Sequence, residues 1–148
     1  MSGTEKLTAR ALVGTWRLAS WRVIYPDGRI TRPFGIRPQG RLLYTPDGGM
    51  SATVTAGGRQ PLDHPNPRLA SAEQRAALFD SSFSYAGRYR VVGNRVRHDL
   101  VVAQNPALLG TPQLRDARLS GGRLELSASE SLPEGGLRRH VLTWARLR

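Results

Sequence analysis

Short turn signals divide most of this chain into segments in which apolar and polar residues alternate, and no other feature limits its fold as strongly. Sequences of this kind connect antiparallel strands in hairpins. Four of them recur along the chain: Pro26-Asp27-Gly28, Pro46-Asp47-Gly48, Gly93-Asn94 and Ser120-Gly121-Gly122. The chain is therefore predicted to form successive antiparallel strands joined by tight turns.

The alternating segments predict about nine strands. They lie at residues 15–25, 28–33, 40–45, 49–56, 85–92, 95–103, 112–119, 123–129 and 137–147. A meander of roughly eight to ten twisted strands removes its two exposed edges by closing on itself. The predicted fold class is all-β, a closed antiparallel up-and-down barrel, with one or two short helices. One of these helices is expected within residues 5–13, where an extended lead-in is the alternative.

The length of 148 residues suits one domain with one core, and we expect a single domain over residues 1–148. The sequence has no apolar run of membrane-spanning length, and its first ten residues are polar. We therefore expect a cytoplasmic protein with no membrane partner. The absence of cysteine excludes disulfides, thiolate metal sites and a cysteine nucleophile.

The largest interruption of the strand pattern is the segment 57–84. Its first half is rich in glycine and proline, and a short helix is predicted after Ser71, with Glu73 in the first turn. A long insertion of this kind in a compact domain often serves as a lid. We expect it to cover one mouth of the barrel, with Leu78 and Phe79 in contact with a ligand.

The formal net charge of +11 favours anionic ligands or nucleic acid as partners. All but one of the 22 basic residues are arginine, however, and a GC-rich coding sequence produces the same bias without selection for binding. Nucleic-acid binding is not expected, because most of the three tryptophans, four tyrosines and three phenylalanines are needed for the core.

Several local motifs occur in a characteristic order along nearly the whole chain. They are Gly14-Thr15-Trp16, Arg32-Pro33-Phe34-Gly35, the run from Gly40 to Ala52, Tyr85-Ala86-Gly87-Arg88-Tyr89 and Leu142-Thr143-Trp144. Together they resemble the bacterial lipocalin-like domain family of the calycin superfamily. The resemblance implies a lipocalin-like barrel with a ligand cavity, and some related small barrels in biosynthetic pathways are cofactor-free cyclases or isomerases. Trp16 is expected to cover the barrel floor.

Alternation predicts which side chains face the interior once an apolar residue fixes each strand. Trp16 and Leu18 bring Ser20, Arg22 and Ile24 inward, and Val96 brings His98, Leu100 and Val102. The other predicted interior residues are Gln113, Arg115, Ala117, Leu119, His140, Leu142, Trp144, Tyr44, Tyr89, Met50, Ala52 and Val54. Acidic residues fall mainly in turns or on outward positions, so an inward arginine needs a ligand anion.

The predicted working pair is His98, which would move a proton, and Arg115, which would hold a developing oxyanion. The expected ligand contacts are Tyr44, Tyr89, His140, Arg22, Met50, Leu100, Trp144 and Phe79. This set suits a cofactor-independent cyclase or isomerase that acts on a hydrophobic, enolic or anionic metabolite. The alternative is a non-catalytic carrier with the same cavity.

No cofactor and no metal are expected, since His98 and His140 lack a third close ligand. Haem ligation by one histidine, which occurs in some calycin barrels, is the alternative that the sequence leaves open. No phosphate-binding glycine loop, serine-hydrolase elbow or paired carboxylates are present. The expected partner is a small-molecule ligand or substrate, and the sequence leaves a homodimer open.

Overall fold

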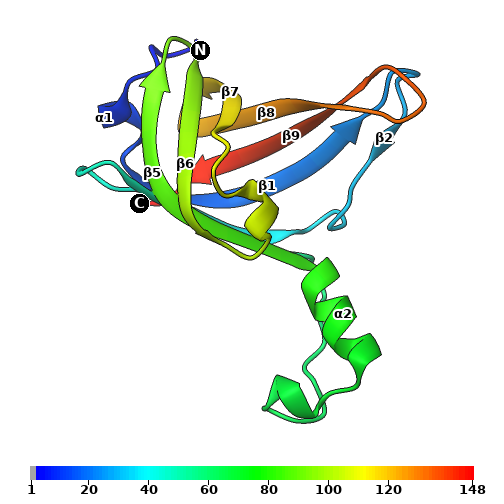
Figure 1. Cartoon of the computed structure of the whole chain (residues 1–148). Coiled ribbons are helices and arrows are strands. Elements are labelled where there is room, and N and C mark those ends of the chain that lie inside the picture. Colours follow the sequence, from blue (N-terminus) through cyan, green and yellow to red (C-terminus); the bar gives the residue numbers. More distant parts are fainter. Residues whose placement is uncertain (1–2) are drawn as a thin grey trace.

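The computed structural model describes residues 3–148 and confirms the predicted closed antiparallel barrel (Figure 1). Eight strands follow one another around the wall, and pairing of the last strand with the first closes it. The extra strand β2 (Ile30–Thr31) pairs with the end of β1 (Gly14–Ile24). The elements are α1 (Ala9–Leu12), β1 (Gly14–Ile24), β2 (Ile30–Thr31), β3 (Gln39–Tyr44), β4 (Gly49–Thr55), η1 (Pro67–Leu69), α2 (Ala72–Asp80), β5 (Ser82–Val92), β6 (Arg95–Ala103), η2 (Pro106–Leu108), β7 (Gln113–Ser120), β8 (Arg123–Ser131) and β9 (Leu137–Arg146).

The predicted turns connect the strands as expected. Gly28 and Gly48 each have a positive φ, +87° and +89°, which glycine adopts without steric cost. Their backbone N–H groups donate to the carbonyls of Tyr25 and Thr45, three residues earlier. These tight turns keep consecutive strands adjacent, and the pairing of the last strand with the first closes the meander.

One end of the barrel is filled by side chains and covered by α1. Trp16 is fully buried there, and its indole N–H donates to the carbonyl of Leu12 over 3.0 Å. The guanidinium of Arg146 stacks on the Trp16 ring and also donates to the carbonyls of Val13 and Ala11. The expected floor residue is thus confirmed, and the interior cavity lies toward the other end.

A β-bulge in β1 overturns part of the predicted inward set. The pairing of β1 with β9 shifts between Leu18 and Ser20, so that one extra residue is inserted in the strand. Because side chains alternate, this insertion exchanges the two faces beyond it. Trp21 and Val23 face the interior, and the prediction that Ser20, Arg22 and Ile24 do so is wrong.

A second irregularity corrects the end of β6. Gly87 pairs with Leu100 while its neighbour Ala86 pairs with Val102, which leaves Val101 as the extra residue. Val102 is 60% exposed, so its predicted inward position is wrong. A Cβ on Gly87 would lie 2.0 Å from the carbonyl oxygen of Asp99, and only glycine permits this close approach of the two strands.

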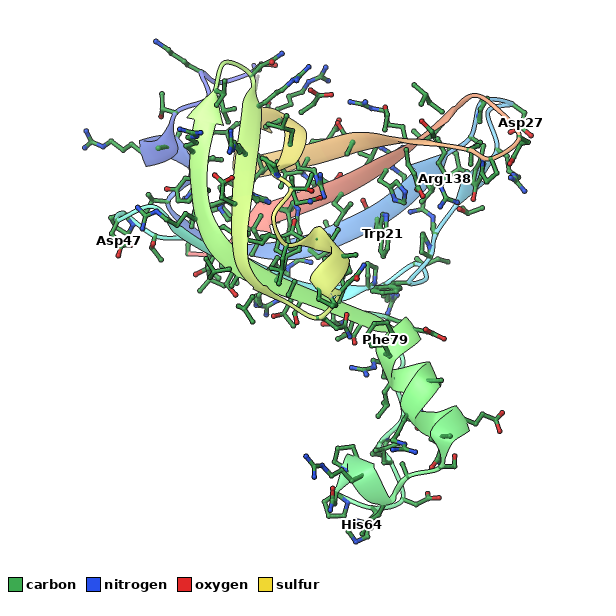
Figure 2. All side chains as sticks on the ribbon, viewed as in Figure 1. Trp21, Asp27, Asp47, His64, Phe79 and Arg138 are labelled. Carbon is green, nitrogen blue, oxygen red and sulfur yellow. The ribbon has the colours of Figure 1, made fainter. Side chains whose placement is uncertain are left out.

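The segment between β4 and β5 projects from the barrel as an arm, residues 57–81 (Figures 1 and 2). Ser71 caps α2 as predicted and forms a reciprocal capping box with Gln74. No residue of α2 is buried, and Phe79 is 54% exposed. In the described part of the chain, no helix is long and apolar enough to cross a membrane.

Candidate ligand-binding site

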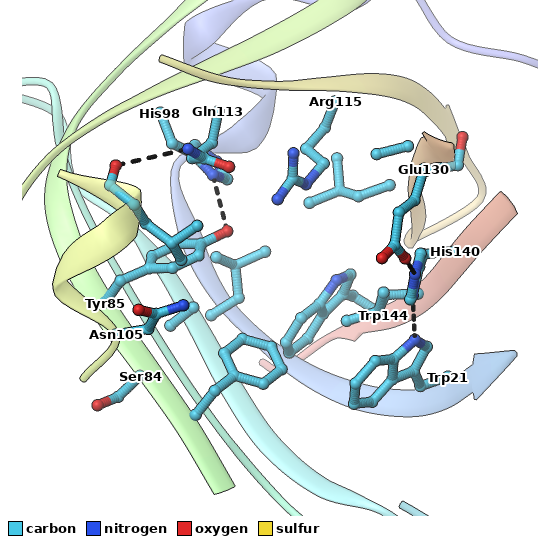
Figure 3. Close-up of a pocket in the computed structure, with 18 of the residues that line it drawn as sticks. Trp21, Ser84, Tyr85, His98, Asn105, Gln113, Arg115, Glu130, His140 and Trp144 are labelled. Carbon is cyan, nitrogen blue, oxygen red and sulfur yellow. Dashed lines mark hydrogen bonds and ion pairs between the residues drawn. The ribbon is translucent and has the colours of Figure 1, made fainter. Parts of the chain in front are cut away.

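A cavity of about 490 Å³ lies inside the barrel beyond the filled end (Figure 3). The exposed surface of its wall is largely apolar, and nine apolar residues contribute to it: Trp21, Leu42, Ala52, Phe83, Leu108, Leu126, Ala128, Leu142 and Trp144. Ten polar residues also contribute: Ser84, Tyr85, His98, Asn105, Gln113, Arg115, Ser127, Ser129, Glu130 and His140. A space of this size and composition suits one small organic molecule.

His98 lies at the inner wall between two tyrosines. Its Nε2 is 2.7 Å from the hydroxyl of Tyr44, and its Nδ1 is 3.2 Å from the hydroxyl of Tyr85. Burial, and next to it the positive charge of Arg115, lowers the pKa of His98 to about 3. The imidazole is therefore neutral, with one ring nitrogen that donates and one that accepts.

The donor and the acceptor in each hydrogen bond of the series Tyr44–His98–Tyr85 can be assigned from the partners that each group has. Tyr44 is 2% exposed, and His98 is the one hydrogen-bond partner of its hydroxyl in residues 3–148. If His98 donated to Tyr44, the buried tyrosine hydrogen would have no acceptor, which costs about 1–3 kcal/mol. Tyr44 therefore donates to Nε2, and Nδ1–H donates to Tyr85. The Tyr85 hydroxyl keeps its own hydrogen free to donate into the cavity.

Arg115 enters the cavity from β7, where it pairs with Val96 while Gln113 pairs with His98. Its Nη1 donates to the carbonyl of Leu114 over 2.9 Å. None of the ion pairs formed within residues 3–148 includes Arg115. Arg115 thus brings a positive charge to an apolar cavity without a carboxylate beside it.

Trp144 presents a further donor without a partner. Its side chain is 2% exposed and lines the cavity, and its indole N–H makes no hydrogen bond with any described residue. Buried polar groups nearly always have a partner in folded proteins. The nitrogen itself has almost no accessible surface, so it is the ring of Trp144, and not its N–H group, that borders the cavity.

The opposite side of the cavity holds a connected set of polar side chains. The indole N–H of Trp21 donates to Nδ1 of His140 over 3.2 Å, and Nε2 of His140 lies 2.7 Å from Glu130. Arg138 donates twice to Glu130 and once to the hydroxyl of Tyr25. Hydrogen bonds from Arg138 and His140 lower the pKa of Glu130 to about 2. Glu130 lines the cavity although acidic residues were expected outside, but its charge is already paired.

The structure brings four of the ten predicted site residues to the cavity wall: His98, Arg115, His140 and Trp144. Tyr44 lies behind His98 in the core, and Met50 and Tyr89 are buried in the core without lining the cavity. Tyr89 donates to the carbonyl of Thr45 toward the filled end. Leu100, Phe79 and Arg22 lie outside the lining as well.

Three important lining residues were absent from the predicted set. Tyr85 shares a strand face with Tyr89, so alternation alone would have found it. Trp21 could not be found in this way, because the bulge before it reverses the faces of β1. Glu130 lies at the end of β8, beyond the predicted limit of that strand. Of the expected lid segment 57–84, only Phe83 and Ser84 line the cavity, and both belong to β5. No residue of the arm lines it, whereas Asn105 and Leu108, at the two ends of η2, do.

The histidines have little capacity to bind a metal in this arrangement. Each ring nitrogen of His98 and of His140 lies within hydrogen-bond distance of a side chain. Within residues 3–148, no three side chains of the metal-binding types come together as a group. The haem alternative therefore gains no support from the geometry of these two rings.

A closed up-and-down barrel with one largely apolar cavity defines a small-molecule-binding barrel of the lipocalin-like kind. The model of the lipocalin-like domain family matches residues 13–147, and the chain belongs to this family. The chain matches no curated protein.

Proposed function

We propose that this protein binds a small organic anion in the barrel cavity, with the anionic oxygens at Arg115. The observation that carries the proposal is a guanidinium that lines a largely apolar cavity without an ion-pair partner in residues 3–148. Arginine keeps its charge at all relevant pH values, and Arg115 is half-buried, so a ligand that shields its guanidinium from water must supply an anion to pair with it. A bound carboxylate, enolate or phenolate supplies that pair.

The other free groups of the cavity support the same ligand class. The Tyr85 hydroxyl is a donor, whereas the one carboxylate of the lining, Glu130, is already engaged by Arg138 and His140. The site therefore offers donors and a positive charge, and it lacks a free negative group. Its aromatic walls, Trp21 and Phe83, suit a flat or apolar body.

Two fluorescent probes with the same aromatic body test this proposal. Anilinonaphthalene sulfonate carries an anion, and N-phenylnaphthylamine lacks it. Arg115→Gln should weaken binding of the sulfonate by about 10-fold or more, because hydrogen bonds to charged groups contribute roughly 1.5–3 kcal/mol. Binding of the neutral amine should change by less than about threefold.

The matched control is Arg118→Gln, since Arg118 lies on the same strand and is exposed outside both cavities. It should leave both affinities unchanged. Equal losses in the two variants, or equal losses for the two probes, would contradict the proposal. Native mass spectrometry of the purified protein should then identify the natural anion.

A cofactor-independent cyclase or isomerase is the second candidate, and the chain from Tyr44 through His98 to Tyr85 favours it. Tyr85 would donate its hydroxyl hydrogen to an oxygen of the substrate, and Arg115 would stabilise the negative charge that develops there. His98 would act through Tyr85, because its two ring nitrogens are engaged and its pKa is about 3. Direct proton abstraction by His98 fits this arrangement poorly.

Incubation of the protein with the co-purified compound and with its precursors separates the two candidates. An isomerase or cyclase should convert one of them, and Tyr85→Phe and Arg115→Gln should each lower turnover by about 100-fold. Phe83→Leu provides a control that changes the wall without removing a donor. A compound that binds and leaves unchanged would favour the carrier.

A further inference from the structure

The wall of the barrel has a lateral opening between β7 and β8. From their hairpin at Ser120 and Arg123, these strands are paired as far as Asp116 and Ser127. Beyond that pair they separate. The first residues of β7, Gln113 to Arg115, pair with β6 on one side only. Figure 1 shows the start of β7 turning toward η2 while β8 continues away beside β9. Backbone groups that face the opening have lost their partner strand.

A second cavity of about 440 Å³ lies at this opening. It shares five residues with the interior cavity: Gln113, Arg115, Ser127, Ala128 and Ser129. Arg115 therefore stands in the boundary between the two spaces. A group bound to its guanidinium can be continuous with both of them.

The outer cavity is polar, in contrast to the interior one. Arg95 and Arg139 both form ion pairs with Asp116, at 3.3 Å and 3.2 Å. Arg139 also donates to the hydroxyls of Ser127 and Ser129. Two guanidinium groups thus share the Asp116 carboxylate, and Arg115, which has no ion pair within residues 3–148, adds a further positive charge to the wall of this cavity.

We propose that the opening is a second subsite and that the protein takes an elongated amphipathic anion. The apolar body occupies the barrel, the anionic group lies at Arg115, and a polar extension of the ligand occupies the outer cavity. This inference rests on the proposed binding of an anion at Arg115. It adds that the anionic group lies within the ligand, between an apolar and a polar part.

Two alkyl phosphates test the subsite: dodecyl phosphate, and its glycerol diester, which continues beyond the phosphate with a polar group. Each is measured by displacement of N-phenylnaphthylamine from the interior cavity. Because the chain has no cysteine, Ser129→Cys can be labelled at one position with a bulky maleimide that fills the opening. Ser131→Cys with the same label is the matched control, since Ser131 is exposed on the same strand and lines neither cavity.

The label at residue 129 should weaken the glycerol diester by about 10-fold or more and affect dodecyl phosphate much less, because only the diester needs the outer space. The label at residue 131 should change neither. Equal affinities of the diester for the two labelled proteins would overturn the subsite. The subsite would also be overturned if the unlabelled protein bound dodecyl phosphate through Arg115 but did not bind the diester. If the unlabelled protein binds neither phosphate, nor the sulfonate probe, the proposed function fails and the subsite with it.

Discussion

His98 is 1% exposed, and its neutral state links folding to pH. The ordinary histidine pKa of about 6.5 applies to the unfolded chain, whereas burial lowers the pKa of folded His98 to about 3. The unfolded state therefore binds a proton that the folded state refuses. The contribution of His98 to stability is fully present above pH 6.5 and is lost progressively as the pH falls toward 3.

Between pH 7 and pH 5 this linkage should cost the wild type about 2 kcal/mol in the free energy of unfolding. Urea denaturation at the two pH values, compared with His98→Gln, isolates the effect because glutamine does not titrate. His64→Gln is the control, since His64 is exposed on the arm. If His98→Gln loses as much stability as the wild type over this range, the folded His98 titrates normally.

Trp144 permits a second prediction at the scale of one atom. Trp144→Phe keeps an aromatic ring in the wall but removes the N–H that has no partner among the described residues. Because that nitrogen has almost no accessible surface, the substitution should leave the affinity for the anionic sulfonate probe within about twofold of the wild type. Binding of N-phenylnaphthylamine should change as little in the same titration. A loss of about fivefold confined to the sulfonate, the value of one ordinary hydrogen bond, would show that the N–H group does reach the ligand.

At the scale of whole elements, the arm at residues 57–81 is separable from the barrel. The backbone N–H of Ala56 donates to the carbonyl of Ser81 over 2.8 Å, so the two ends of the arm already lie side by side. Replacing residues 57–80 with Asn-Gly should therefore join β4 and β5 in an ordinary hairpin. No residue of α2 is buried, so little packing is removed.

We expect this deletion to change the free energy of unfolding by less than about 1 kcal/mol, and probe affinity by less than about twofold. Chemical denaturation and fluorescence titration measure the two quantities. Hydrogen exchange in the intact chain should show fast exchange in α2 with and without ligand. Slow exchange on ligand binding, or a large loss of affinity on deletion, would restore the arm as a lid.

Strand positions followed from the sequence because turn residues and alternation are local properties. Gly28 and Gly48 mark their turns by chemistry alone, and His98 and Arg115 reach the cavity because their strands keep strict alternation up to them. The bulges at Ala19 and Val101 depend on how neighbouring strands pair, which no local pattern reveals. This is why Arg22 and Val102 were placed inside and Trp21 was missed.

At the scale of the whole molecule, closure of the barrel could be predicted from the sequence. How far the open cavity extends into the barrel could not. Alternation identifies interior positions along every strand, but it does not tell which of them are packed and which are open. Tyr89 and Met50 are interior residues at packed positions, whereas Tyr85, on the same strand face as Tyr89, borders the cavity. The difference arises because α1, Trp16 and their neighbours fill one end, which is a property of the assembled fold.

The net charge of +11 is also a property of the whole molecule, and the structure bears on what it can bind. Proteins that bind single-stranded nucleic acid combine positive charge with exposed aromatic side chains on which bases stack. Here Trp16, Tyr44 and Trp144 are buried, and Trp21, Phe83 and Tyr85 line the interior cavity. The surface thus offers charge with few stacking platforms.

We therefore expect a single-stranded DNA of about 20 nucleotides to bind only weakly at physiological salt, with a Kd of roughly 10 µM or more, and to be released as salt rises. The double substitution Arg97→Gln and Arg118→Gln should weaken this binding further. It should leave the sulfonate probe within about twofold of its wild-type affinity, because both residues lie outside the two cavities. Fluorescence anisotropy of labelled DNA over a salt series, beside the probe titration, measures both. Submicromolar DNA binding that persists at physiological salt would mean that the surface charge, and not the cavity, defines the main partner.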